Sequence, residues 1–391
     1  MKFFTAAVAA AAGLSAVGTI HAQSLPACSS VYTRKELLSL TPTEWSTVSG
    51  VLNAMQRNGW FAWFSYLHTQ WFTQIHNQSQ FFPFHRRFVY EWERVARLFN
   101  PAYVQPYWDE MRDYRAPATS PVLSSSWAGG NGQGTNRCVL NGVQAGWTMT
   151  YQSSHCLQRN FGNNGQPGPW YSPEYISSIL QRSTTMDSFR SQIEYSLHGI
   201  VHINMGGDMA TRASPNDWLF MLHHANIDRL WWQWQKAGHL WTMDGRNFDG
   251  NAMTLNTNIV YYNEPVRAVM QLGNGNMCYQ YASDPVRRRS LLGNLEDLIE
   301  SVLDLDDLKE WFPETAKGSN KPGLPAPAPA PAPAPTPVIA VANGRVIPYP
   351  KELPDSWVVS MGGDLDSAHR VRDDARKFVN AMKKAGYKSP I

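Results

Sequence analysis

Apolar and polar residues recur with a helical period over two long stretches of the chain. The first covers residues 30–110 and the second residues 185–240, and both are rich in helix formers and aromatic residues. The segment between them, residues 114–175, contains the breakers GGNGQGTN and GNNGQPGP and is expected to form loops. Residues 241–283 carry Gly and Asn turns and suggest short strands. The pattern therefore predicts a mainly α fold with long loops and few short strands.

The chain beyond residue 283 has a different composition. Residues 284–321 contain three consecutive arginines and then an amphipathic helix, expected over residues 291–308, whose other face is acidic. Residues 322–337 are a Pro/Ala-rich linker of polyproline type. Residues 338–391 form a C-terminal tail, which is predicted to end in a helix within AHRVRDDARKFVNAMKKAGY.

The N-terminus predicts secretion. Residues 1–22 have one lysine, then an apolar run, then small residues before Ala22, which is typical of a signal peptide. The alternative, a membrane span, would be short, rich in Ala and Gly, and without a stop-transfer flank. No other stretch has 18 apolar residues, so we expect a secreted, extracellular and soluble protein without a membrane partner. Residues 23–283 are then the expected catalytic domain.

The net charge and the cysteines indicate which partners and which compartment to expect. The net charge of +3 over 391 residues gives no reason to expect nucleic acid as a partner. Four cysteines in a secreted chain are expected to form disulfides, and they allow three pairings. Cys138 and Cys156 bracket a Gly/Asn-rich loop, which favours that pair and leaves Cys28 with Cys278. The sequon at Asn77 predicts a glycan. Nothing in the sequence predicts an oligomeric state.

The eleven histidines are unevenly distributed. Seven of them fall in two clusters within the helical stretches, namely His68, His76 and His85, and then His198, His202, His223 and His224. His198 and His202 are four residues apart and project from one face of a helix. His223 and His224 are rotated by about 100° on a helix, so only one of them is expected to point toward the same metal. A single histidine is most often a core or surface residue, but two clusters of this kind favour metal binding.

The residue types around the histidines indicate which metal they hold. Neither cluster contains a cysteine or a carboxylate at ligand spacing. Structural zinc normally brings cysteines, hydrolytic zinc usually one carboxylate, and di-iron bundles Glu and Glu-x-x-His. Two sites of three imidazoles each suit copper, and we predict two copper ions. Pro83 comes just before a helical run that is expected to start near His85.

Several motifs together resemble the tyrosinase and catechol oxidase family of type-3 copper proteins. They are the spacing His68-x7-His76-x8-His85, the run FPFHRRFVYEWE, the pair His198-x3-His202 and the run LFMLHHANIDRLW. The likeness covers roughly residues 28–283 and is greatest to short secreted fungal polyphenol oxidases. It implies a four-helix bundle that holds a dinuclear copper site. It also implies a set of copper ligands, namely His68, His76, His85, His198, His202 and His224, with His223 as a structural neighbour.

The resemblance also implies a reaction. Phenolic small molecules and O2 would be the partners, and the enzyme would oxidise o-diphenols to o-quinones, with weaker hydroxylation of monophenols. One alternative is a type-3 copper carrier of dioxygen, but such carriers are usually much larger assemblies than this 44.1 kDa chain. The other alternative is a metallohydrolase, which needs an acid or base beside the metal, and only Glu194 offers one.

Three residues near the ligands are implied to decide which phenols react. Glu194 matches a glutamate that helps to hold a water near the site in many relatives. The asparagine that often follows the first ligand of the second copper is replaced by Gly199. Diphenol oxidation is therefore expected to exceed monophenol hydroxylation. Thr211 aligns with a gate residue over the copper, and its small size is expected to admit substituted rings.

Other positions are implied to support the site or depart from the family. Asp228, one turn beyond His224, is expected to accept an N–H from a ligand imidazole, and the alternative is an ion pair with an arginine. The segment CYQYA at 278–282 resembles the tyrosine motif that closes the core, with Arg34 as its partner, which supports the Cys28–Cys278 pairing. Gln74 replaces a cysteine that forms a thioether in many fungal relatives.

The resemblance also has an implication for the C-terminal tail. Longer relatives carry a C-terminal domain that covers the copper site until it is cut off. The 54 residues of 338–391 are too few for such a domain, so the tail is expected to be at most a weak lid. The apolar stripe of residues 291–308 is expected to dock on the core.

Overall fold

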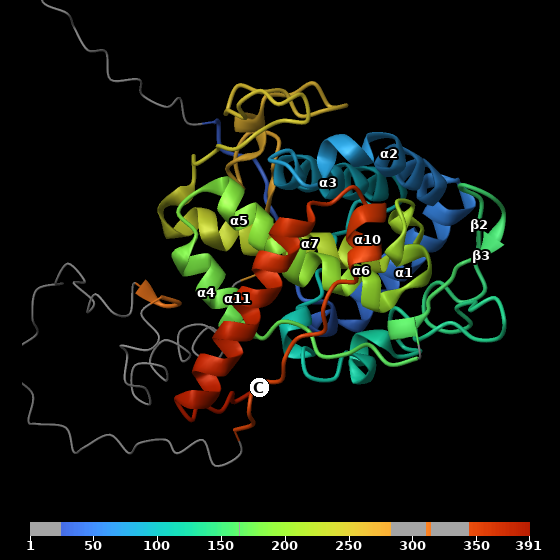
Figure 1. Ribbon diagram of the computed structural model, residues 1–391. Helices are drawn as coiled ribbons and strands as arrows, with labels where there is room; N and C mark the ends of the chain where they lie inside the picture. The colour runs from blue at the N-terminus through green and yellow to red at the C-terminus, as the bar shows by residue number, and fades with distance from the viewer. Residues whose placement is uncertain (1–24, 164, 283–309, 314–343) are drawn as a thin grey trace, which may run out of the picture.

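The computed structural model describes residues 25–163, 165–282, 310–313 and 344–391, which Figure 1 shows in colour. The helices are α1 (Pro42–Arg57), α2 (Trp60–Ile75), α3 (Phe81–Phe99), α4 (Pro173–Arg182), α5 (Met186–Ile193), α6 (Gly199–Met205), α7 (Leu219–Trp234), α10 (Asp355–Ser360) and α11 (Leu365–Lys384). The strands are β1 (Tyr32–Arg34), β2 (Thr148–Met149), β3 (His155–Cys156) and β4 (Tyr279–Tyr281). The prediction of a mainly α fold with few short strands is confirmed.

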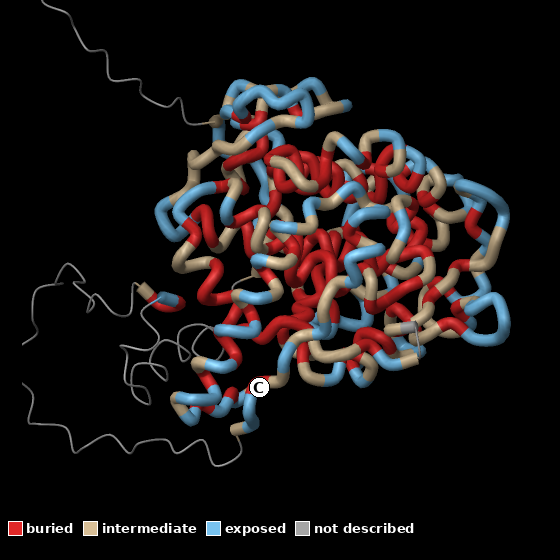
Figure 2. The backbone as a smooth tube through the Cα atoms, in the orientation of Figure 1, coloured by how far each residue is buried: buried red, intermediate tan, exposed pale blue. Residues whose placement is uncertain are grey.

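Helix α3 is the central element of the core. It packs on α1, α2 and α7, and the tube in Figure 2 shows that buried residues concentrate where these helices meet. Its first turns are buried on every side, including Phe84, His85 and Phe88. The helix starts at Phe81, four residues before the expected start near His85, because proline is tolerated in the first turn of a helix. His85 therefore stands inside a helix that its neighbours hold from all sides.

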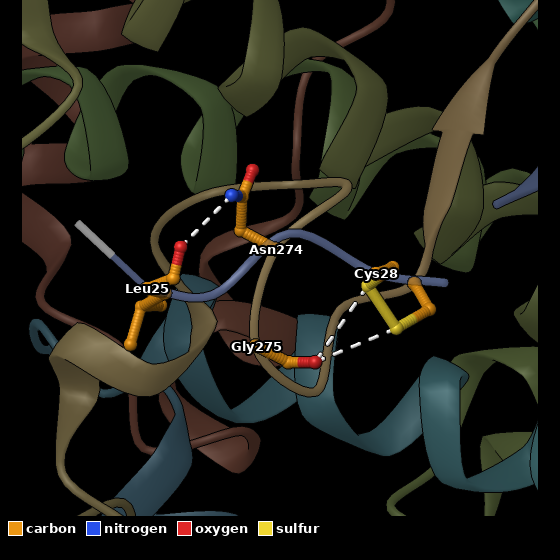
Figure 3. The surroundings of a disulfide bond; sticks show 5 residues. Leu25, Cys28, Asn274 and Gly275 are labelled. Carbon is orange, nitrogen blue, oxygen red and sulfur yellow. Dashed lines mark hydrogen bonds between the residues drawn. A yellow bond between two sulfur atoms is a disulfide. The ribbon is translucent and has the colours of Figure 1, made fainter. Parts of the chain in front are cut away.

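The two ends of the core domain meet, as the sequence predicted. Strands β1 and β4 pair in parallel, and Cys28 forms a disulfide with Cys278 (Figure 3). The Arg34 guanidinium lies 3.5 Å from the centre of the Tyr279 ring and donates to the Tyr281 hydroxyl at 3.1 Å. The predicted contact of Arg34 with the tyrosine motif is confirmed.

A second disulfide closes the long loop region between α3 and α4. Cys138 is bonded to Cys156, beside the two-stranded antiparallel sheet of β2 and β3, so the favoured pairing of all four cysteines is confirmed. Two disulfides indicate an oxidising compartment. Among the residues that the structure describes, no helix combines the length and the apolar character that crossing a membrane requires.

The C-terminal segment 344–391 packs on the core, and α11 confirms the helix predicted there. Phe378, Val379 and Met382 of α11 are buried, and the Phe378 ring packs against Tyr175 of α4. At the far end, the Arg115 side chain donates to the terminal carbonyl oxygen of Ile391 at 2.5 Å. Four predicted segments lie outside the described residues and stay predictions: the signal peptide, the arginine run, the helix over 291–308 and the Pro/Ala linker. The start of the tail, residues 338–343, also lies outside them.

Candidate metal centre

Seven buried histidines form two groups at the centre of the helices. One group is His68, His76 and His85, and the other is His198, His202, His223 and His224. Within each group, one ring nitrogen of every member lies within 4.8 Å of those of the others. The predicted clustering of histidines is therefore confirmed, and four helical segments supply them: α2 with its C-cap, α3, the turn leading into α6 with α6 itself, and α7.

Backbone carbonyl oxygens orient five of the rings. The Nδ1 atoms donate to Arg212 O (His68, 2.7 Å), Phe72 O (His76, 3.2 Å), Phe81 O (His85, 2.7 Å), Glu194 O (His198, 3.3 Å) and Met209 O (His202, 2.7 Å). A carbonyl oxygen can only accept, so each Nδ1 carries the proton and each Nε2 keeps a lone pair. This is the tautomer that binds a metal through Nε2, with a fixed ring direction.

The free nitrogens converge from both groups. The Nε2 atoms of His68 and His85 lie 3.5 Å apart, and those of His202 and His224 lie 3.3 Å apart. The rings of His85 and His224 stack at 4.3 Å and join the two groups. The Nε2 atom of His198 is buried without a hydrogen-bond partner. The lone pairs left on Nε2 of the five oriented rings suit cations placed among them, one in each group.

Burial keeps these imidazoles neutral. It lowers the pKa of His68 and of His202 to about 3, and it lowers the pKa of His76, His85, His198 and His224 well below the usual value. Charge repulsion between neighbouring rings adds to the effect for His85 and His224. Neutral imidazole is the form that binds metal, so the protein need not lose protons when a metal enters.

His223 lies closer to the centre than the sequence suggested. Rotation about the helix was expected to turn it away from the metal, yet its ring packs 5.1 Å from His202 and 5.5 Å from His198. Its Nδ1 is 2.7 Å from Oε1 of Glu110, a fully buried carboxyl that Asn226 also contacts. Glu110 could not be predicted as a partner of His223, because it lies 113 residues earlier, in the loop region before α4.

Glu194 lies in a π-type turn, Glu194–His198, rather than in a regular helix. Ser196 interrupts the helical backbone there with φ −113° and ψ −105°, and turns of this type are frequent at functional sites. Oε1 of Glu194 accepts from the Asn77 backbone N–H at 2.7 Å, and Oε2 accepts from Arg190 at 2.9 Å. Burial raises the pKa of Glu194, and Arg190 opposes that rise. The carboxyl therefore lines the pocket with both oxygens already bonded.

The pocket above the histidines is closed by the C-terminal tail, which the sequence did not predict. Trp357, Val358, Met361 and Gly363 line it together with the histidines, and the remaining cavity is about 30 Å³. That volume holds about two waters but no phenol ring. The six residues of α10 and the turn after them are enough to line the mouth, so a tail too short for a separate domain still covers the site.

Three hydrogen bonds hold α10 and its flanks in place. Trp357 Nε1–H donates to Ala210 O at 3.0 Å, and Arg212 donates to Ser360 O at 3.1 Å. The Asp364 backbone N–H donates to the Tyr195 hydroxyl at 2.7 Å. Two of these contacts fall on the segment whose Arg212 carbonyl orients His68, and the third falls on the turn that carries His198, so the tail rests directly on supports of both histidine groups.

Gly199 faces the tail. A Cβ atom at this position would come within 2.9 Å of Leu353 Cδ1 and 3.1 Å of Leu353 Cδ2. The missing side chain of Gly199 therefore makes room for Leu353.

One expectation about the pocket walls is wrong in position. Thr211 is exposed and is not among the lining residues, because a turn places Ser214 there and ties the Thr211 hydroxyl to Asp208 O at 2.9 Å. Asn77 lines the pocket, and its Oδ1 accepts from Tyr195 at 2.8 Å. Asn77 also borders an open surface pocket with Gln78 and Asp187, so a glycan there stays a prediction.

Asp228 takes part in a different contact from the one expected. Its carboxylate accepts from Arg86 at 2.5 Å and from the hydroxyls of Tyr279 and Tyr281, each at 2.5 Å. Among the described residues Asp228 makes no hydrogen bond to an imidazole, and backbone carbonyls orient five of the rings instead. The alternative of an ion pair with an arginine describes Asp228 correctly, and its role is to hold α7 against α3 and β4.

Comparisons with known proteins agree with this geometry. A family model described as the common central domain of tyrosinase matches residues 57–237. The chain is 32% identical over 292 residues to the tyrosinase-like protein phomQ2 of Diaporthe leptostromiformis, covering 65% of this chain and 74% of that one. It is 31% identical over 300 residues to the tyrosinase ustQ of Aspergillus flavus, covering 68% and 83%.

A solved structure shares the fold. A polyphenol oxidase variant from Thermothelomyces thermophila superposes with a TM-score of 0.56 at 22% identity, over 66% of this chain and 91% of that one. The likeness places the helices around the histidines within a known architecture.

Proposed function

The chain belongs to the tyrosinase family, and from this premise we propose that it oxidises o-diphenols to o-quinones with O2, with weaker hydroxylation of monophenols. The family uses a dinuclear copper centre, and the two buried histidine groups fit two copper ions. Oriented neutral imidazoles without a carboxylate or cysteine among them are the observation that supports this function best.

Six of the seven histidines are the proposed ligands: His68, His76 and His85 for one ion, and His198, His202 and His224 for the other. His224 is preferred to His223 because its ring stacks on His85 of the other group, as a centre with two adjacent ions requires. His223 is proposed as a support, since Glu110 holds its Nδ1 and its ring packs on two ligands.

Held by these histidines, two copper ions would supply the redox chemistry for moving electrons from the catechol to O2. Two catechols lose four electrons and four protons, which reduce one O2 to two waters. The chain orients the imidazoles through backbone carbonyls, and the Phe72 ring gives the pocket an apolar wall. Glu194, at the pocket wall, is positioned to hold a water that accepts the phenolic proton.

Copper analysis together with oxygen uptake tests this function. We expect two copper ions per chain and oxygen consumption with a catechol that exceeds consumption with the matching monophenol. Copper with O2 binding but no catechol turnover, even after α10 is opened, would identify a carrier. Zinc in place of copper would indicate a hydrolase and refute the proposal.

We also propose secretion, because both disulfides are formed and residues 1–22 have the pattern of a signal peptide. N-terminal sequencing of the protein from the culture medium should begin at Gln23. A protein that stays in the cell with an intact N-terminus would refute this.

Gly199→Asn is expected to raise monophenol hydroxylation at least about tenfold relative to diphenol oxidation, and by no more than the roughly 10²–10⁴ that a general base contributes. The new amide would help Glu194 to orient a water, and it would also push Leu353 away from the site. Initial rates on a monophenol and its catechol give the ratio.

Gly199→Ala is the matched control, because its Cβ displaces Leu353 but brings no amide. We expect Ala to raise both activities and leave their ratio unchanged. An equal rise of the ratio in the Ala and Asn variants would show that displacement of the tail, and not a held water, decides the preference.

A further inference from the structure

A second cavity opens on the outer side of α2 and α3, away from the histidines. It measures about 550 Å³ and shares no lining residue with the pocket that α10 covers. Aromatic rings form much of its wall, namely Trp60, Trp63, Phe64, Tyr261 and Tyr262. We call this cavity the aromatic groove. Nothing in the proposed oxidation uses it.

Two rings of the aromatic groove are exposed, whereas Trp60 and Tyr262 are half-buried and Phe64 is buried. Trp63 is 42% exposed and Tyr261 45%. Trp63 stacks at 5.6 Å on Tyr66, which is also 42% exposed and extends the row of rings along α2. Scattered apolar residues on a surface are ordinary, but a contiguous set of large rings around a cavity marks a binding site.

The walls are held in place before any ligand arrives. The loop 258–265 closes on itself through a hydrogen bond from Ile259 N–H to Glu264 O at 2.8 Å. Arg87 of α3 lies over the Tyr262 ring at 4.5 Å and pairs with the Glu264 carboxylate at 3.3 Å. The loop that presents Tyr261 is thus fastened to α3, so little conformational entropy is lost on binding.

The charges at the groove cancel. Glu91 pairs with Arg87 at 2.8 Å and with Arg94 at 2.9 Å, and Glu264 pairs with Arg87. Two arginines and two glutamates give no net charge, so an anionic or cationic ligand finds no counter-charge. The Arg94 and Glu91 side chains are 54% and 30% exposed, and they offer donors and acceptors at the rim.

This combination selects among possible occupants. A second copy of the chain would bring another concave groove to this one, and two concave surfaces do not fill each other. A membrane surface would need protruding apolar and basic side chains, whereas Glu91 and Glu264 stand here. A neutral sugar polymer has flat C–H faces that stack on aromatic rings, and hydroxyls that both donate and accept hydrogen bonds.

We propose that the aromatic groove binds a neutral polysaccharide chain. Sugar rings stack on Trp60, Trp63 and Tyr261, and their hydroxyls bond to Arg94 and Glu91 at the rim. Binding of this kind would hold the protein on a solid polymer while the histidine site stays free, because the two cavities have separate walls.

Retention on insoluble polysaccharides tests the proposal. The copper-loaded full chain is mixed with cellulose or with chitin particles, and the fraction bound is measured over a range of polymer amounts. Trp63→Ala combined with Tyr261→Ala should weaken retention at least about tenfold, since two stacking rings are lost. Phe248→Ala, at a ring 49% exposed outside the groove, should retain binding, and catechol turnover in solution should be equal in all three proteins.

Each other outcome overturns the proposal. Wild-type protein that binds neither cellulose nor chitin has no such site. Equal retention of the double variant would place binding elsewhere on the surface. Retention only on an acidic polysaccharide, lost in salt, would reflect the net positive charge of the chain. Retention only on a phenolic polymer such as lignin, lost in the double variant, would make the groove a site for aromatic polymers.

Discussion

His202→Ala should lower the copper content from two ions per chain to one and abolish catechol turnover. The His202 Nε2 lies 3.3 Å from that of His224, and its Nδ1 is fixed by Met209 O, so its loss removes one of three oriented donors. His85→Ala should have the same effect on the other ion. Metal analysis of the purified variants, with oxygen uptake on a catechol, gives both quantities.

His223→Ala is the matched control, because it changes the neighbouring histidine on the same helix. We expect it to retain both copper ions, with lower stability because Glu110 then loses its imidazole partner inside the core. One copper ion in His223→Ala and two in His224→Ala would reverse the assignment of the pair. The four-membered group makes this a real test, since both rings lie within reach of a metal.

The helices and the histidine clusters could be predicted from the sequence because both depend on local spacing. Residues four apart lie on one side of a helix in any fold, so their spacing was enough to bring His198 and His202 together. The apolar residues around them bury that side. The pairing of Cys28 with Cys278 was favoured as well, since the near pair left these two cysteines and the resemblance of the tyrosine motif implied that the ends meet.

The surroundings of the histidines could not be predicted, because they come from segments far apart in the chain. Glu110 reaches His223 across 113 residues, and Trp357 reaches Ala210 across 147. Asp228 was expected to accept a hydrogen bond from a ligand imidazole, but its carboxylate accepts from Arg86 and from two tyrosine hydroxyls instead. Thr211 was expected at the pocket wall, but the chain turns after it and Ser214 lines the pocket instead.

The contact of the tail with the site leads to the second large effect: Trp357→Ala should raise catechol oxidation at least about tenfold. The cavity of about 30 Å³ excludes a phenol ring, so a substrate enters only when α10 moves away. Removing the Trp357 ring deletes one hydrogen bond and the apolar contact that favour the closed form. When the open form is rare, a change of about 1.4 kcal/mol in the free-energy difference between the closed and open forms changes the open fraction tenfold.

Val358 and Val359 provide a matched pair on the same helix. Val358 is 2% exposed and lines the pocket, whereas Val359 is 58% exposed. Val358→Ala should raise kcat/KM for the catechol, Val359→Ala should leave it unchanged, and copper content should be equal in both. Unchanged activity in Trp357→Ala and Val358→Ala would mean that α10 does not limit access. A fall in both would mean that α10 is a working wall of the substrate site.

Cleavage at the arginines of residues 287–289 should not by itself open the site, because the tail is held by contacts far from the cut. Phe378, Val379 and Met382 of α11 are buried against the core, and Asp374 pairs with Arg182 of α4. A nicked wild-type protein should therefore keep both fragments together on size exclusion and keep its low activity. Nicking of Trp357→Ala should leave its raised activity unchanged. Release of residues 344–391 on nicking, with a rise in wild-type activity, would show instead that the covalent link holds α10 over the histidines.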